Sequence, residues 1–127
     1  MIVTVCQIDN IPENFEKCFV NLQKYLLTKQ TDLLLLPEMP FSEWLAKDKN
    51  YDPGKWEKAV NEHNKRIEYL SNFNAKNIIG TRPIINNEGK FLNEAFLYEQ
   101  SSKKIIPIHE KYYLPNDEGF WETSWYK

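Results

Sequence analysis

The stretch Asp32-Leu33-Leu34-Leu35-Leu36-Pro37-Glu38-Met39-Pro40 sets the fold class of this chain. Its four consecutive leucines are too few for a long helix and end at a proline, which predicts a β-strand over 33–36, buried on both faces. Glu38 follows this strand and lies between two prolines that stiffen its backbone. Because ligands in α/β folds lie at the carboxyl ends of strands, Glu38 is a candidate functional residue. The alternative is a charged residue that begins a surface loop.

Extended and helical patterns alternate around this strand. Phe15, Phe19, Leu22 and Leu26 recur at helical spacing, and β-branched residues precede them. The expected elements, in chain order, are a strand over 2–8, a helix over 12–29, the strand over 33–36, a helix over 55–73, and strands over 77–81, 91–98 and 104–109. Pro83 is expected to close the third strand. This order, βαβαβ followed by a β-meander, predicts an α/β fold whose first strands are parallel.

Size and composition limit the classes of function. The chain has 127 residues, 42% of them hydrophobic, and a net charge of −2, which fits one domain with a packed core. The sequence has no basic stripe, so a nucleic-acid partner is not expected. No apolar run is long enough to span a membrane, and residues 1–5 lack the features of a signal peptide. A cytoplasmic protein is therefore expected, and its two cysteines indicate no disulfide framework.

Sequence motifs for cofactors and metals are absent. The four glycines form neither a phosphate-binding loop nor a dinucleotide fingerprint. His63 and His109 lie far apart, and His109-Glu110 lacks the spacing of a zinc-binding helix. We therefore expect no cofactor and no bound metal.

Two charged residues follow apolar strands, one early in the chain and one late. Glu38 comes after 33–36, and Lys111 comes after 104–109. If both strands belong to one sheet, the two side chains converge on one pocket. There the carboxylate can accept a proton and the ammonium can stabilise a developing oxyanion. The alternatives are a structural ion pair, or no contact at all.

The C-terminal segment combines charges with large aromatic side chains. A domain seldom ends with Trp121, Trp125 and Tyr126 exposed, because large apolar side chains prefer burial. The chain is therefore expected to stop inside a structured segment. Trp44, Trp121 and Trp125 are candidates for a substrate pocket or for a core against a missing half.

Two segments resemble the first two catalytic motifs of the nitrilase, or carbon–nitrogen hydrolase, superfamily: Leu-Leu-Leu-Leu-Pro-Glu-Met-Pro at 33–40 and His-Glu-Lys-Tyr-Tyr-Leu-Pro at 109–115. The strand that ends in Gln7, the segment 79–81 and Asn93-Glu94-Ala95 are also similar to that family, in the right order. The resemblance covers the whole chain. It implies the N-terminal half of an α-β-β-α sandwich, with a mixed sheet that carries helices on one face.

The family implies a Glu–Lys–Cys triad. By this match Glu38 is the general base and Lys111 stabilises the oxyanion. Many members of the family have a second glutamate in the pocket, after the lysine motif. Glu122 resembles that residue, and Glu118 is the less favoured match. The third motif, which carries the nucleophile, has no counterpart, because no cysteine follows Cys18.

Both cysteines are interpreted as small core residues. Cys6 lies in the expected first strand and Cys18 in the expected first helix, and free cysteine is often buried. Neither matches the nucleophile position. The chain is therefore interpreted as a partial carbon–nitrogen hydrolase domain over 1–127, truncated before the nucleophile.

Two functional hypotheses follow. The first is a hydrolase that cleaves a non-peptide carbon–nitrogen bond in a small amide, carbamoyl or nitrile substrate, of which amides are the commoner choice. The second is a truncated, inactive fragment or a non-catalytic partner. Its open half-core favours a homo-oligomer or association with a complementary half. A non-catalytic α/β binding module would need a ligand signature, which the sequence lacks.

Overall fold

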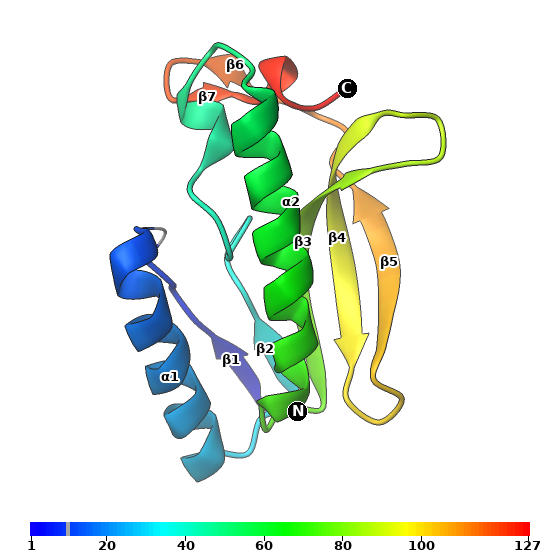
Figure 1. Ribbon diagram of the computed structural model, residues 1–127. Coiled ribbons are helices and arrows are strands. Elements are labelled where there is room, and N and C mark those ends of the chain that lie inside the picture. Colours follow the sequence, from blue (N-terminus) through cyan, green and yellow to red (C-terminus); the bar gives the residue numbers. More distant parts are fainter. Residues whose placement is uncertain (10) are drawn as a thin grey trace.

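The computed structural model describes residues 1–9 and 11–127 (Figure 1). Its helices and strands, in chain order, are β1 (Val3–Val5), α1 (Pro12–Thr28), β2 (Leu33–Leu35), α2 (Pro53–Ile67), β3 (Asn77–Ile85), β4 (Phe91–Glu99), β5 (Lys104–Glu110), β6 (Asn116–Asp117) and β7 (Phe120–Trp121). Strands β1 to β5 form one sheet in sequence order, in which β1, β2 and β3 are parallel, and β4 and β5 continue antiparallel. The predicted α/β fold with a mixed sheet and a β-meander is confirmed.

Each helix begins at a proline and buries one apolar stripe. The buried residues of α1 are the four that the spacing predicts, Phe15, Phe19, Leu22 and Leu26. In α2 the Asp52 carboxylate accepts hydrogen bonds from the N–H groups of Gly54 and Lys55, which caps the first turn. This cap starts α2 two residues before the predicted position 55, and α2 ends at Ile67, where a 3-10 turn over Glu68–Asn72 takes over. Among the described residues, no helix has the length and apolar character needed to cross a membrane.

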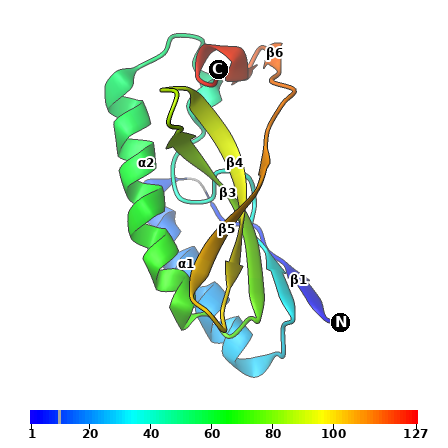
Figure 2. The same cartoon turned by 90° about the vertical axis from the view of Figure 1, so that its right-hand side faces the viewer.

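Both helices lie on the same side of the sheet, and no helix of the described residues covers the other side (Figure 2). We call these sides the covered face and the open face. In β2, Leu34 points to the covered face and is fully buried, whereas Leu33 and Leu35 point to the open face and are only partly buried. The predicted burial of the leucine strand on both faces is therefore wrong here, because the described chain supplies only one layer of helices.

Each face is defined by residues that pair across neighbouring strands. The covered face includes Leu34, Ile78, Phe96 and Tyr98, all of which are buried. The open face carries one apolar row that crosses all five strands, formed by Val5, Leu35, Ile79, Leu97 and Ile106. Val5 is 73% exposed and Ile106 is 39% exposed, so this row remains accessible to solvent.

Strand β3 continues through Pro83, where the sequence predicted an end. Pro83 pairs with Asn93 of β4 on one side. On the other side β2 has already stopped, since its last paired residue, Leu35, lies opposite Ile79. Proline is tolerated along such an unpaired edge because no ladder hydrogen bond is lost.

The aromatic C-terminus is buried within the chain itself. Trp125 is 0% and Tyr126 is 2% exposed, and both pack in a second core cluster with Trp56 of α2. The Trp125 indole N–H donates to the Asp48 carbonyl oxygen at 2.7 Å, and the rings of Trp56 and Tyr126 lie 5.7 Å apart. These two residues are thus core residues of this chain. The alternative role of Trp125 in a substrate pocket, or against a missing half, is wrong.

Candidate active site

Glu38 lies in the loop that follows β2. The main chain just before it is tied to the sheet, because Leu36 N–H donates to the Ile79 carbonyl oxygen at 2.9 Å. Just after it, Met39 N–H donates to the Thr81 hydroxyl at 2.7 Å, and Met39 has a positive φ of 47°. A residue with a side chain is uncommon in that region and stays there only when its surroundings hold it. The backbone around Glu38 is therefore fixed by β3 on both sides.

Lys111 is the first residue after β5. Its own N–H donates to the Asn93 carbonyl oxygen at 2.8 Å, which fixes its main chain to β4. Its Nζ donates to Glu38 Oε1 and to Glu122 Oε1, each at 2.9 Å. The two residues that the sequence placed after separate strands are therefore in direct contact, and the ammonium lies between two carboxylates.

Glu122 approaches Lys111 from the C-terminal turn over Glu122–Ser124. It is 1% exposed, and its N–H donates to the Pro115 carbonyl oxygen at 3.0 Å. Its Oε2 has no hydrogen-bond partner among residues 1–9 and 11–127. Glu118, the less favoured choice, is exposed. Of the two glutamates considered from the sequence, Glu122 is the one that reaches Lys111.

The charges of this cluster act on one another's pKa values. Burial by itself lowers the pKa of Lys111, but the hydrogen bonds to Glu122 and Glu38 outweigh it and hold that pKa above its ordinary value. Burial raises the pKa of Glu122, the Lys111 ammonium opposes this, and the charge of Glu38 adds to it. Lys111 is therefore held as a cation, and Glu122 is a carboxyl group that takes up a proton more readily than usual.

Asn93 is a member of this site that sequence reasoning did not single out. Its side-chain amide donates to Glu38 Oε1 at 2.7 Å, and the residue is 2% exposed. The only signal in the sequence was the segment Asn93-Glu94-Ala95, used as a point of family likeness. The pleat of β4 sends Asn93 and Glu94 to opposite faces, and nothing in the sequence alone states which face meets Glu38.

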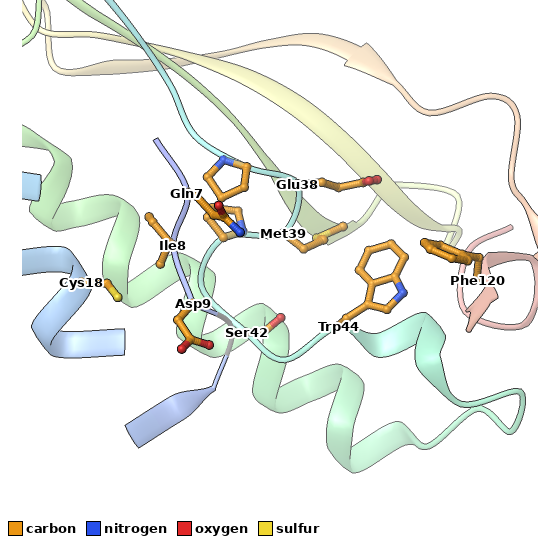
Figure 3. Close-up of a pocket in the computed structure, with 11 residues that line it drawn as sticks. Gln7, Ile8, Asp9, Cys18, Glu38, Met39, Ser42, Trp44 and Phe120 are labelled. Atoms are coloured by element: carbon orange, nitrogen blue, oxygen red, sulfur yellow. The ribbon is translucent and has the colours of Figure 1, made fainter. Parts of the chain in front are cut away.

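A cavity of about 800 Å³ opens beside Glu38. Figure 3 shows Glu38 and Met39 in the middle of its lining, with Gln7 on one side and Trp44 and Phe120 on the other. The Trp44 indole N–H donates to the Gly119 carbonyl oxygen at 3.0 Å, which holds the loop after β2 against the β6–β7 turn. Of the three tryptophans considered for a pocket, Trp44 therefore lines the cavity.

The cysteines lie apart from the carboxylate–lysine contact. Cys6 follows β1, which ends at Val5 and is shorter than the predicted strand over 2–8. Its thiol donates to the Leu35 carbonyl oxygen at 3.4 Å, and burial raises its pKa to about 11, so the thiolate is disfavoured. Cys18 of α1 lines the cavity and packs against the core under the covered face. Within the described residues, neither is a hydrogen-bond partner of Glu38 or Lys111.

In the part of the chain that the structure describes, no group of three or more His, Cys, Asp and Glu side chains could hold a metal ion.

No family model and no curated protein matches the sequence. Solved structures do match the fold. A carbon–nitrogen hydrolase from Helicobacter pylori G27 superposes with a TM-score of 0.80 over 100% of this chain, at 19% sequence identity.

The fold is that of the carbon–nitrogen hydrolases. A glutamine-dependent NAD+ synthetase from Acinetobacter baumannii has a TM-score of 0.66 at 18% identity, and an N-terminal amidase with a Gln-Val peptide has a TM-score of 0.54 at 17% identity; each match covers 94% of this chain. The chain spans 44% of the H. pylori hydrolase, 22% of the synthetase and 30% of the amidase. It thus corresponds to less than half of each nitrilase-fold structure.

Proposed function

We propose that this chain carries the Glu–Lys–Glu part of a carbon–nitrogen hydrolase site, which cleaves amide, N-carbamoyl or nitrile bonds of a small molecule. The observation that supports this most directly is the position of Lys111 Nζ, 2.9 Å from Glu38 Oε1 and 2.9 Å from Glu122 Oε1. Two strand ends bring a proton acceptor and a fixed cation together beside an open cavity. The fold match is independent support, because it covers the whole chain.

The proposed reaction uses a cysteine thiol from outside residues 1–127. Glu38 accepts the thiol proton, the thiolate attacks the substrate carbon, and Lys111 stabilises the negative charge on the substrate oxygen or nitrogen. For an amide, the intermediate collapses as Glu38 returns the proton to the departing nitrogen, which leaves as an amine or ammonia. Glu38 then takes a proton from water, the hydroxide attacks the thioester carbon, and the acid is released as the cysteine thiolate leaves and takes the proton back from Glu38. Glu122 holds Lys111 from the buried side.

The open face supports a partner that supplies this thiol. The apolar row lies next to the site. On the same face, Thr81 is two residues beyond Ile79 in β3, and Asn93 is four residues from Leu97 in β4, toward the end of the sheet that carries Glu38 and Lys111. Both edges of the sheet are poor pairing surfaces, since β1 has three residues and β5 contains Pro107. We therefore propose face-to-face packing with a second sheet, the complementary half of the site.

A second copy of this chain is the weaker choice for that partner. It would cover the apolar row, but its thiols are Cys6 and Cys18, both of which pack against the core under the covered face, and the pKa of Cys6 is raised by burial. A homo-oligomer would therefore bury the open face without completing the proposed triad.

The test is hydrolysis by the assembly purified through a tag on this chain from the cells that make it. Ammonia release is measured with primary amides, N-carbamoyl compounds and nitriles. Glu38→Gln is expected to lower kcat/KM by about 10²- to 10⁴-fold, the contribution of a positioned base. The control is Glu43→Gln, in the same loop, whose exposed side chain pairs with Lys47. Equal rates for the parent and the Glu38→Gln assembly would contradict the proposal.

A second candidate function is a non-catalytic association partner. The two cysteines favour it, because among the described residues neither thiol is a recorded hydrogen-bond partner of Glu38 or Lys111, and Cys6 donates instead to the Leu35 carbonyl oxygen. The same purification separates the two functions. An assembly that forms through the open face but hydrolyses none of the three substrate classes supports the second. Sedimentation of the isolated chain as a stable monomer with a cooperative melt counts against it.

A further inference from the structure

We propose that Asn93 is a positioning residue, which holds Glu38 and Lys111 in one fixed geometry through two different groups. This inference rests on the proposed function and assigns it a further residue. The side-chain amide of Asn93 donates to Glu38 Oε1 at 2.7 Å, and its carbonyl oxygen accepts from Lys111 N–H at 2.8 Å. One residue of the sheet thus touches both members of the proposed pair.

The location of Asn93 makes it a rigid support. It lies in β4, with β3 on one side through its pairing with Pro83, and with β5 on the other. It is 2% exposed, so water competes little with its amide. A buried amide group that loses its hydrogen-bond acceptor destabilises the folded chain. The arrangement in which Asn93 donates to Glu38 is therefore favoured over arrangements in which the two side chains are apart.

The contact also distinguishes the two oxygens of Glu38. Asn93 and Lys111 both donate to Oε1. An oxygen that already accepts two hydrogen bonds is a poor proton acceptor, because a new proton would displace a donor. The proton of the thiol or the water is therefore taken by Oε2, and Asn93 fixes the rotation of the carboxylate that places this oxygen.

The neighbouring residue provides a matched control. Glu94 points to the covered face, where its Oε1 accepts from Arg82 at 2.7 and 2.9 Å. It is as deeply placed in the same strand as Asn93, with 5% exposure, but it has no contact with Lys111 or Glu38 among the recorded hydrogen bonds of the described residues. A variant at 94 therefore perturbs β4 without altering the support of the site.

The first test is an NMR comparison of the isolated chain and its variants, labelled with ¹⁵N. The side-chain amide resonances of Asn93 are expected to move in Glu38→Gln, because a neutral amide replaces the carboxylate that accepts from them. Glu94→Gln is expected to leave these resonances in place. Asn93 side-chain resonances that stay in place in Glu38→Gln, or that move equally in Glu94→Gln, overturn the proposal.

The second test measures kinetics of the tagged assembly. Asn93→Leu keeps the size and main-chain bonds but removes the donor, and Asn93→Asp places a second acceptor against Glu38. Both are expected to lower kcat by roughly 10- to 100-fold, part of the contribution of a positioned base, with KM changed by less than about threefold. Glu94→Gln is expected to keep the parent kcat per folded molecule, with folding checked by thermal melts.

The two proposals fail in different ways. If Glu38→Gln loses hydrolysis while both Asn93 variants keep full rates, the proposed hydrolase function stands and the positioning role of Asn93 is wrong. If the assembly is inactive but the Asn93 amide resonances still respond to a change at Glu38, the contact between the two residues stands and their role in catalysis is wrong.

Discussion

The two faces of the sheet differ in how deeply their apolar side chains are buried. On the covered face, Leu34, Ile78 and Phe96 are fully buried beneath α1 and α2 (Figure 2). On the open face, the row that contains Leu35 and Ile79 is only partly buried. The same strands therefore carry a completed core on one side and an apolar surface without a covering layer on the other.

The charged groups repeat this difference. On the covered face, Arg82 and Glu94 form a one-to-one pair across β3 and β4. At the end of the open face, one ammonium, Lys111, faces two carboxylates, and Glu122 Oε2 has no partner within the described residues. A balanced pair serves stability, whereas an unbalanced one beside a cavity is available for chemistry. The covered face therefore carries the packed core, and the open face carries the site that we propose.

Leucine-to-alanine substitutions on the two faces should give the largest difference. Leu34→Ala is expected to cost about 2–5 kcal/mol of unfolding free energy in the isolated chain, because it leaves a cavity in a packed core. Leu35→Ala, one residue away, is expected to cost about 1 kcal/mol, since its side chain is only partly buried. Urea unfolding of both variants measures this.

Repeating these variants in the tagged assembly sharpens the comparison. If a second sheet covers the open face, the cost of Leu35→Ala should rise toward that of Leu34→Ala. Equal costs already in the isolated chain would show that the two faces do not differ.

The next largest effect is expected in the pH dependence of stability, which should reveal a buried histidine of α2. His63 of α2 donates from Nδ1 to the Ala59 carbonyl oxygen at 2.8 Å and accepts from Phe41 N–H at 3.3 Å. The pKa of His63 is lowered to about 4, chiefly by burial; the hydrogen bond to Ala59 opposes this shift and the positive charge of Arg82 adds to it. The unfolded chain binds this proton below about pH 6.5, so stability should fall by about 3 kcal/mol as the pH drops from 6.5 to 4.

His63→Leu tests this assignment. The pH dependence of its unfolding free energy in that window should decrease by the contribution of one bound proton. Urea titrations at several pH values give the slopes, and a parent-like slope for His63→Leu contradicts the assignment.

Glu122, on the side of the site, should give a smaller effect of the opposite sign. Burial raises the pKa of Glu122 in the folded state, so the folded chain holds this proton to higher pH than the unfolded chain. Its contribution to stability is therefore largest below the ordinary glutamate pKa and is lost as the pH rises through the raised value.

Glu122→Gln should remove this decline, a change of at most about 1.4 kcal/mol per pH unit. Glu118→Gln, at an exposed position, serves as the control. If stability in this window fell with rising pH equally in the parent and in Glu122→Gln, another group would be responsible.

Local pattern was sufficient for most of the elements and insufficient at their ends. The α1 stripe over Phe15 to Leu26 was predicted because helical spacing leaves one arrangement that buries all four side chains. The end of β3 was misplaced, because whether Pro83 can stay in a strand depends on a neighbour, β2, that has already stopped. The site was predicted in part for the same reason: Glu38 and Lys111 follow recognisable strands, whereas Asn93 lies inside one.

The sequence by itself determined the strand and helix order, the mixed sheet, and the two charged residues at strand ends, since these depend on periodicity and on residues close in the chain. Only the tertiary structure decided which face the helices cover, that Trp125 and Tyr126 belong to this chain's own core, and that Asn93 and Glu122 meet Glu38 and Lys111. The physical reason is that alternation along a strand fixes which side chains share a face. The packing of distant segments then decides which of the two faces is covered.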